Sequence, residues 1–278
     1  MSAEEKVVKI GIIKPGAIGT SVILEYLLDE RADRRDIDVR VYGTGAKMVV
    51  DENLLKAAIE ANHDLYIVAA PANVKIIKKI AKKLKEASKR VIIISDEPTK
   101  KAAKDFEAEG YGYILVYGDP MIGARREFLD PTEMALFNSY VLGVLSATGA
   151  LRIVTEAIDK VVEALKKGEE PELPKLKIDR NAIERQGGFT NPYAKAKAIA
   201  AYEIARRVAS LTTEACFVIQ EPERYIVIAA AGHEMLKVAA RLAEEARDLE
   251  KSEDTVLRTP HHPTGRTLSK TKLLEKPR

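Results

Sequence analysis

The sequence is poor in the residues that build disulfides, zinc sites and aromatic binding platforms. Its 278 residues include one cysteine, no tryptophan, five phenylalanines and ten tyrosines. A single cysteine excludes an intrachain disulfide framework and a zinc site built from cysteines. Cys216 lies in the apolar run 215–218, which favours a place in the core over a nucleophilic role.

Long hydrophobic runs and an excess of one charge are also missing. No apolar run approaches the roughly 20 residues of a membrane-spanning helix, and the N-terminal residues lack the apolar centre of a signal peptide. Lys and Arg number 45 against 42 Asp and Glu, a net charge of +3, which argues against nucleic-acid binding through bulk charge. We therefore expect a soluble, cytoplasmic protein that binds neither nucleic acid nor membrane.

Common catalytic motifs are incomplete or absent. His233 and Glu234 resemble the start of a zinc-protease motif, but Lys237 stands where the second histidine is required. The adjacent His261 and His262 cannot place both rings on one metal from one face of a helix or strand, so we expect no metal site. The sequence has neither a G-x-S-x-G elbow nor a P-loop. Hydride transfer remains open to such a chain, because there the cofactor supplies the chemistry.

The first 120 residues alternate between strand-like and helix-like segments. The predicted strands cover residues 7–13, 37–42, 65–70, 91–95 and 113–117, and the predicted helices residues 20–30, 53–62, 73–90 and 99–109. Strands that are uninterrupted apolar runs are typical of a parallel sheet covered on both faces. The pattern predicts an α/β fold with a doubly wound, mostly parallel sheet in a cofactor-binding domain of residues 1–130.

Residues 131–278 have a different, mainly helical pattern. Residues 132–167 are helical in character with a break near Gly149, and the linker 168–174 follows. A further helix is expected over 191–211, with Asn191 as its cap, and another over 233–250. Between them, the runs 216–220 and 225–230 predict a short hairpin. We expect a helix-bundle domain that ends in an irregular tail.

Glycine-containing loops follow the first two predicted strands. Ligands of open parallel sheets bind beyond the carboxyl ends of the strands. In the segment 14–20, Gly16 and Gly19 match the last two glycines of the dinucleotide motif G-x-G-x-x-G, and Lys14 replaces the first. We therefore expect close backbone approach and a helix N-terminus, beginning near Thr20, that faces an anion. The alternative is that the glycines serve only tight turns.

The second loop disfavours NAD. An NAD site usually carries Asp or Glu at the end of the second strand, where it binds the ribose. Here that position holds Gly43, Thr44 and Gly45, with Lys47 close behind. Small residues and a cation suit a phosphate or a large flat ring better than a ribose diol.

A dense polar segment, residues 119–131, follows the last predicted strand and leads into the helices. The paired Arg125 and Arg126 suit an anionic or carbonyl-rich ligand, and Asp119 suits the polar edge of a ring. An ion-paired hinge between two domains is the alternative interpretation of the same residues.

At this point the chain resembles a known family, the coenzyme F420-dependent methylenetetrahydromethanopterin dehydrogenases of methanogenic and related archaea. The resemblance runs nearly end to end. It is carried by the words at residues 14–21, 28–34, 112–115, 121–131, 191–194, 233–235, 249–252 and 268–270. It implies an α/β domain plus a helix bundle, assembled as a homo-oligomer built from dimers. The implied reaction moves a hydride reversibly between the methylene carbon of the tetrahydropterin and the deazaflavin ring of F420, without a metal, as a step of one-carbon metabolism in methanogenesis or its reverse.

The resemblance also implies where the ligands bind. The cofactor-binding residues are then Lys14, Gly16, Gly19, Thr20, Gly43, Thr44 and Lys47. The pterin-binding residues are Arg125, Arg126, Asn191 and Tyr193, and Asp119 and Glu127 are placed as catalytic carboxylates that stabilise the methenyl cation. Two alternatives remain: a related one-carbon pterin dehydrogenase that uses NADP, with Lys47 near the adenosine phosphate, and a pterin-binding paralogue without catalytic activity.

Overall fold

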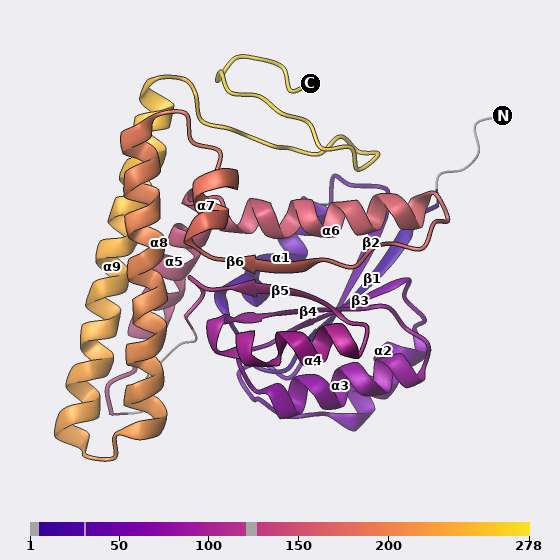
Figure 1. The fold of residues 1–278 in the computed structure, drawn as a ribbon, viewed down its shortest axis with the longest axis horizontal. Helices are drawn as coiled ribbons and strands as arrows, with labels where there is room; N and C mark the ends of the chain where they lie inside the picture. The colour runs from indigo at the N-terminus through magenta and orange to yellow at the C-terminus, as the bar shows by residue number, and fades with distance from the viewer. Residues whose placement is uncertain (1–5, 31, 121–126) are drawn as a thin grey trace.

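The sheet is parallel throughout and has six strands. The computed structural model describes residues 6–30, 32–120 and 127–278. The strands are β1 (Val8–Lys14), β2 (Ile37–Gly43), β3 (Leu65–Ala69), β4 (Val91–Asp96), β5 (Gly112–Val116) and β6 (Lys175–Ile178). Their order is β2-β1-β3-β4-β5-β6, with parallel pairing at every step. This order confirms the predicted doubly wound α/β architecture (Figure 1).

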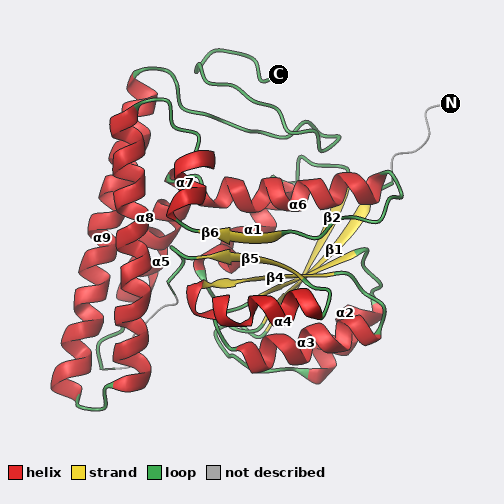
Figure 2. Ribbon diagram, in the orientation of Figure 1, coloured by secondary structure: helices red, strands yellow, loops and turns green. Residues whose placement is uncertain are grey.

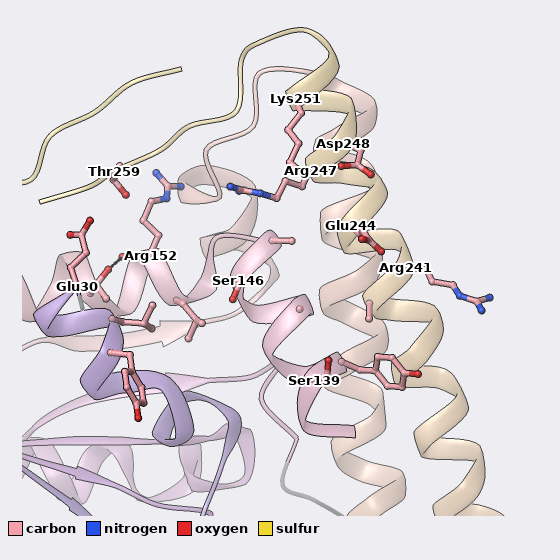
Figure 3. Close-up of a pocket in the computed structure, with 18 of the residues that line it drawn as sticks. Glu30, Ser139, Ser146, Arg152, Arg241, Glu244, Arg247, Asp248, Lys251 and Thr259 are labelled. Atoms are coloured by element: carbon pink, nitrogen blue, oxygen red, sulfur yellow. Dashed lines mark hydrogen bonds and ion pairs between the residues drawn. The ribbon is translucent and has the colours of Figure 1, made fainter. Parts of the chain in front are cut away.

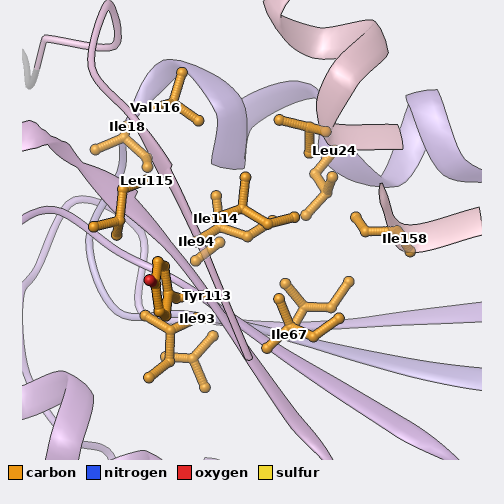
Figure 4. Packing of buried hydrophobic residues seen from close by; sticks show 14 of the residues in the cluster. Ile18, Leu24, Ile67, Ile93, Ile94, Tyr113, Ile114, Leu115, Val116 and Ile158 are labelled. Atoms are coloured by element: carbon orange, nitrogen blue, oxygen red, sulfur yellow. The ribbon is translucent and has the colours of Figure 1, made fainter. Parts of the chain in front are cut away.

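Helices cover both faces of this sheet (Figures 1 and 2). One face carries α1 (Gly19–Asp29) and α6 (Ala150–Lys166), and the other carries α2 (Glu52–Glu60), α3 (Val74–Glu86), a 3₁₀ helix (Glu97–Ala102) and α4 (Ala103–Ala108). The strands are apolar because both of their faces are buried; β3, β4 and β5 are buried along their whole lengths. Figure 4 shows Ile67, Ile94 and Ile114 packed in this core beside Leu24 of α1 and Ile158 of α6.

The helices of the second half pack at one end of the sheet (Figure 1). They are α5 (Pro131–Ala147), α7 (Arg180–Gln186), α8 (Pro192–Thr213) and α9 (Pro222–Ser252). Helices α8 and α9 form a long antiparallel pair, closed at one end by the ion pair between Lys197 and Glu245 (2.5 Å). Within the described ranges, no single helix has the length and apolar character of a membrane span; α5 and α6 meet those criteria only as a pair bent by 65°.

The predicted hairpin at 216–220 and 225–230 is wrong. Residues Glu214–Val218 continue α8 as a π-helical turn that includes the half-buried Cys216, and α9 begins at Pro222. Proline is tolerated there because the first turn of a helix needs no donor at that position. The buried residues Tyr225, Ala229 and Leu236 recur at helical spacing. The short β-branched run at 226–228 imitated a strand, but the helical period extends through it.

Strand β6 escapes prediction because half of its four residues are lysine. It lies at the edge of the sheet and pairs with β5, with Tyr113 opposite Lys175. Helix α6 and strand β6 both follow residue 130 in the chain, yet both join the sheet. The division into domains 1–130 and 131–278 stays a prediction.

The C-terminal tail returns across α6 toward the start of the sheet (Figure 1). Two isolated antiparallel bridges, Arg258 with Lys270 and His261 with Thr267, give it a hairpin-like course. The Arg35 N–H donates to the carbonyl of Pro263 (2.8 Å). The irregular tail predicted from the sequence is thus fixed to the α/β part of the molecule.

Candidate active site

Three loops meet around Gly16 at the carboxyl edge of the sheet. β1 has β2 on one side and β3 on the other, so the chain reverses its direction of winding here, which is where ligands of such sheets bind. Gly16 has φ +85°, and a Cβ on it would lie 2.7 Å from Met48 Cγ and 3.2 Å from Pro71 Cδ. Both the conformation and the space require glycine. The predicted close backbone approach in the first loop is therefore present.

The second loop lies directly beside the first. The Thr44 N–H donates to the carbonyl of Lys14 (3.2 Å), and the Thr44 hydroxyl donates to the carbonyl of Lys47 (2.5 Å). A Cβ on Gly43 would meet nothing closer than 3.9 Å, and one on Gly45 would meet nothing within 4 Å. The space over this loop is thus open to a ligand.

The two lysines of these loops differ in availability. Lys14 Nζ is 2.8 Å from Glu25 Oε1, and both side chains are largely buried. Lys47 is exposed. Of the two predicted cofactor-binding lysines, Lys47 has its charge turned to solvent, whereas Lys14 is engaged within the protein.

The N-terminus of α1 does not face an open anion site, contrary to the expectation from the sequence. Asp119 Oδ1 accepts from the Gly19 N–H (2.7 Å), and Oδ2 accepts from the Thr20 N–H (2.8 Å) and hydroxyl (2.6 Å). A Cβ on Gly19 would lie 2.3 Å from Val141 Cγ1, so α5 covers the same position. The carboxylate that fills this helix terminus belongs to the protein itself.

Asp119 is fully buried in this arrangement. Burial raises its pKa to about 6, against the lowering effect of the hydrogen bonds from Thr20 and Gly19. It links the residue after β5 to the helix after β1 and does not face a cleft in this structure. Its predicted contact with the pterin stays a prediction.

Asp96 is a second buried carboxyl at the same edge, and no role was predicted for it. It ends β4, is 5% exposed and lies near the hydroxyls of Ser95 (3.4 Å) and Thr99 (3.5 Å). Burial, and next the charge of Asp119, raise its pKa to about 7. The signal in the sequence is its position: an acidic residue directly after a wholly apolar strand reaches the ligand edge of a parallel sheet.

The segment after β5 contains several predicted residues. Arg125 and Arg126 lie outside the described residues. Glu127 is described and exposed. Phe128 contacts the His233 ring edge-on, with centroids 4.8 Å apart, and Phe137 contacts it at 4.4 Å.

This packing places His233 of α9 beside the polar segment. His233 is 5% exposed, and its Nδ1 is 3.7 Å from Glu133 Oε2. The sequence shows His233 only as part of an incomplete zinc motif and of a family word. Over the described portion of the chain, no group of three or more His, Cys, Asp or Glu side chains is arranged to hold a metal ion.

Asn191 and Tyr193 are not brought together with Glu127. Asn191 caps α8, where its Oδ1 accepts from the N–H groups of Tyr193 (2.8 Å) and Ala194 (3.1 Å). Its own N–H donates to Glu250 of α9 (2.8 Å). From His233 to Glu250 is 250 − 233 = 17 residues of one helix, or about 25 Å at 1.5 Å per residue. The two parts of the predicted pterin cleft therefore lie at opposite ends of the helical pair.

The largest cavity described, of about 960 Å³, lies elsewhere. It is bounded by the C-terminal half of α1, by α5, α6 and α9, and by the tail (Figure 3). None of the predicted site residues lines it. Helix α1 begins at the carboxyl edge, so its C-terminal half is directed away from that edge. The candidate active site is the carboxyl edge and not this cavity.

Comparisons with known proteins agree over nearly the whole chain. The family model for methylene-5,6,7,8-tetrahydromethanopterin dehydrogenase matches residues 8–278. F420-dependent methylenetetrahydromethanopterin dehydrogenases from Archaeoglobus fulgidus and Methanothermobacter marburgensis are each 52% identical to the chain, covering 98% of it and 99% of their own lengths. A solved structure of an F420-dependent methylene-tetrahydromethanopterin dehydrogenase, in complex with methylene-tetrahydromethanopterin and coenzyme F420, matches with a TM-score of 0.92. That protein is 47% identical, and the match covers 98% of this chain and 100% of its own.

Proposed function

Because the chain belongs to the methylene-5,6,7,8-tetrahydromethanopterin dehydrogenase family, we propose that it catalyses reversible hydride transfer between methylenetetrahydromethanopterin and coenzyme F420, giving the methenyl pterin and reduced F420. The observation that carries this function is the full-length likeness to a structure solved with both ligands. It confirms the family indicated by the sequence words. A cytoplasmic homo-oligomer built from dimers is part of the proposal.

The loops around Gly16 fit a large flat coenzyme with an anionic tail. When bound, F420 accepts or gives the hydride at its deazaflavin ring. Gly16 lets the first loop pack against Met48 and Pro71, and Gly43 leaves the space over the second loop open. We assign the tail to Lys47, whose charge is exposed, because the N–H groups at the start of α1 already donate to Asp119. Lys14, Thr20 and Thr44 then shape the loops and hold them together.

The pterin is assigned to the space bordered by the segment after β5. Glu127 is exposed there, and a carboxylate near the methenyl carbon stabilises the positive charge that forms when the hydride leaves. Arg125 and Arg126 remain the proposed anchors of its polar groups. Asp119 acts by positioning, since it fixes the start of α1 below the first loop. Asn191 and Tyr193 stay predictions for a more distant part of the ligand.

A spectroscopic assay tests the function directly. The purified protein is mixed with methylenetetrahydromethanopterin and either F420 or NADP, and reduction of each cofactor is followed by absorbance. We expect turnover with F420 and none with NADP. Turnover with NADP alone would show a related pterin dehydrogenase of different cofactor use. Pterin binding by calorimetry without turnover on either cofactor would show a paralogue that has lost catalysis.

A further inference from the structure

Three arginines from separate parts of the chain line one small cavity away from the carboxyl edge. They are Arg152 of α6, Arg247 of α9 and Arg258 of the tail, and the cavity has a volume of about 230 Å³. Figure 3 shows Arg152 and Arg247 turned toward each other across the space between α6 and α9. Like charges brought together by folding cost free energy unless something compensates for them.

Arg247 has no such compensation within the protein. Among the hydrogen bonds and ion pairs between described residues, none involves Arg247, although it is half-buried. Its pKa is lowered by burial and then by the positive charge of Arg258. An arginine in this state has all five donors of its guanidinium available to a ligand.

The one carboxylate that lines the same cavity is already committed. Glu250 Oε1 accepts from the N–H groups of Thr190 (2.7 Å) and Asn191 (2.8 Å), and Oε2 accepts from the hydroxyls of Thr190 (2.8 Å) and Thr255 (2.5 Å). Glu156, outside the cavity lining, is 3.7 Å from Arg152. Three guanidinium groups thus face one carboxylate whose oxygens point to other donors.

The backbone around Arg152 fits this side chain closely. Arg152 donates to the carbonyl of Gln186. The turn that follows has Gly188 at φ +78°, where a Cβ would lie 2.5 Å from Arg152 Nη2. A Cβ on Gly149, at φ +83°, would lie 2.7 Å from the carbonyl of Gly187. The guanidinium is therefore held in place before any ligand arrives, which lowers the entropic cost of binding.

The small cavity opens into the large one, because both are lined by Arg152, Arg247 and Thr259. The large cavity adds Tyr26 and Tyr140, together with leucines of α1 and α6. We propose that the two cavities form a binding site for a small phosphate-bearing molecule, separate from the hydride-transfer cleft, with the phosphate among the three arginines and a ring or apolar body toward the tyrosines. Guanidinium groups match phosphate oxygens in bidentate geometry.

The test uses the full-length protein with inorganic phosphate and pyrophosphate as probes, at ionic strength held constant with chloride. Calorimetry and the rise of Tm with ligand concentration report binding. We expect the Arg247→Gln variant to bind at least about tenfold more weakly, because a charge-assisted hydrogen bond to the ligand is lost. The matched control is Arg207→Gln, an exposed arginine of α8, which should bind like the wild type. Because Arg247 has no partner in the protein, its variant should keep the wild-type Tm without phosphate.

Two further arms separate this site from other sources of the signal. Phosphate binding at the arginines should persist when the protein is saturated with F420, and competition by F420 would show that the coenzyme's own phosphate uses them. Gel filtration of Arg247→Gln should show an unchanged assembly. A changed assembly with unchanged phosphate affinity would show that this face meets carboxylates of a second copy of the chain, and equal affinity in both variants would also overturn the proposal.

Discussion

Asp119 accepts hydrogen bonds from both the backbone N–H and the hydroxyl of Thr20, at 2.8 and 2.6 Å, across 99 residues of sequence. This contact joins the loop after β5 to the start of α1. Replacing Thr20 by valine keeps the shape and removes the hydroxyl from a buried carboxylate. We expect the free energy of unfolding at pH 8 to fall by about 1.5–3 kcal/mol, the usual value for a hydrogen bond to a charged group, as measured by urea denaturation.

The matched control is Thr132→Val in the first turn of α5, where the threonine is exposed. Its effect on stability should stay within about 0.5 kcal/mol. Similar effects of the two substitutions would show that the Asp119–Thr20 contact does not hold the loop and helix together.

Asp96 should make the protein less stable as the pH rises. Burial and Asp119 raise its pKa from 3.8 to about 7, so the folded state binds the proton more tightly than the unfolded state. Between about pH 4 and pH 7 stability therefore falls with increasing pH. The Asp96→Asn variant mimics the protonated form, so its Tm should exceed that of the wild type at pH 8 and match it near pH 4.

The outcome is informative because most exposed carboxylates give the opposite sign. The control is Asp105→Asn, a carboxylate exposed on α4 and paired with Lys78 at 2.7 Å. Its substitution should not raise the Tm at pH 8. A pH-independent gain from Asp96→Asn would mean that the carboxyl is neutral at all these values or that the gain has another source.

The sequence contained the strands of the sheet because burial on both faces leaves a continuous apolar run, as at Leu65–Ala69. It also contained α8, since Asn191 is a local cap of its N-terminus. The strand β6 carries two lysines at a sheet edge and lacks that signal. The use of Asp119 as a cap for α1 has no local signature, because it depends on how β1 and β5 are placed by the rest of the fold.

His261 fixes the tail through two carboxylates. Its Nδ1 is 2.7 Å from Glu30 Oε2, and its Nε2 is 2.8 Å from Asp159 Oδ2, which also belongs to the buried pair with Arg34. Burial lowers the pKa of His261, but Asp159 and Glu30 outweigh burial and Arg34, so the net pKa is raised above 6.5. The stabilisation is therefore complete below pH 6.5 and is lost as the pH rises through the higher folded value.

The His261→Gln variant should lower the Tm at pH 6 and have a smaller effect at pH 9. Hydrogen exchange of residues 258–270 should increase in parallel. The matched control is His262→Gln, the neighbouring exposed ring, which contacts only Thr264. An effect of His261→Gln that is the same at both pH values would exclude a charged imidazole as the source of the stabilisation.

Lys47 should contribute to coenzyme binding and not to pterin binding. Its charge is exposed in the open second loop, where solvent and salt weaken each ionic contact. We expect Lys47→Ala to raise the KM for F420 about three- to tenfold, with the KM for the pterin unchanged, and the effect should shrink at high salt. Lys56→Ala on α2, where Lys56 is 75% exposed and 3.7 Å from Glu60, is the control. Equal effects of both variants would remove Lys47 from the site.

Gly16→Ala should impair coenzyme binding through the shape of the three loops. The substitution combines an unfavourable φ of +85° with a Cβ only 2.7 Å from Met48 Cγ and 3.2 Å from Pro71 Cδ, so one of the neighbouring loops must move. Gly45→Ala is a matched control, because Gly45 has φ +66° and nothing within 4 Å of its Cβ position. Both variants should lose about 1–2 kcal/mol of stability from backbone strain. Only Gly16→Ala should also raise the KM for F420, measured in the absorbance assay, because only there are the loops displaced. Equal KM values for the two variants would show that the coenzyme does not lie over the junction of these loops.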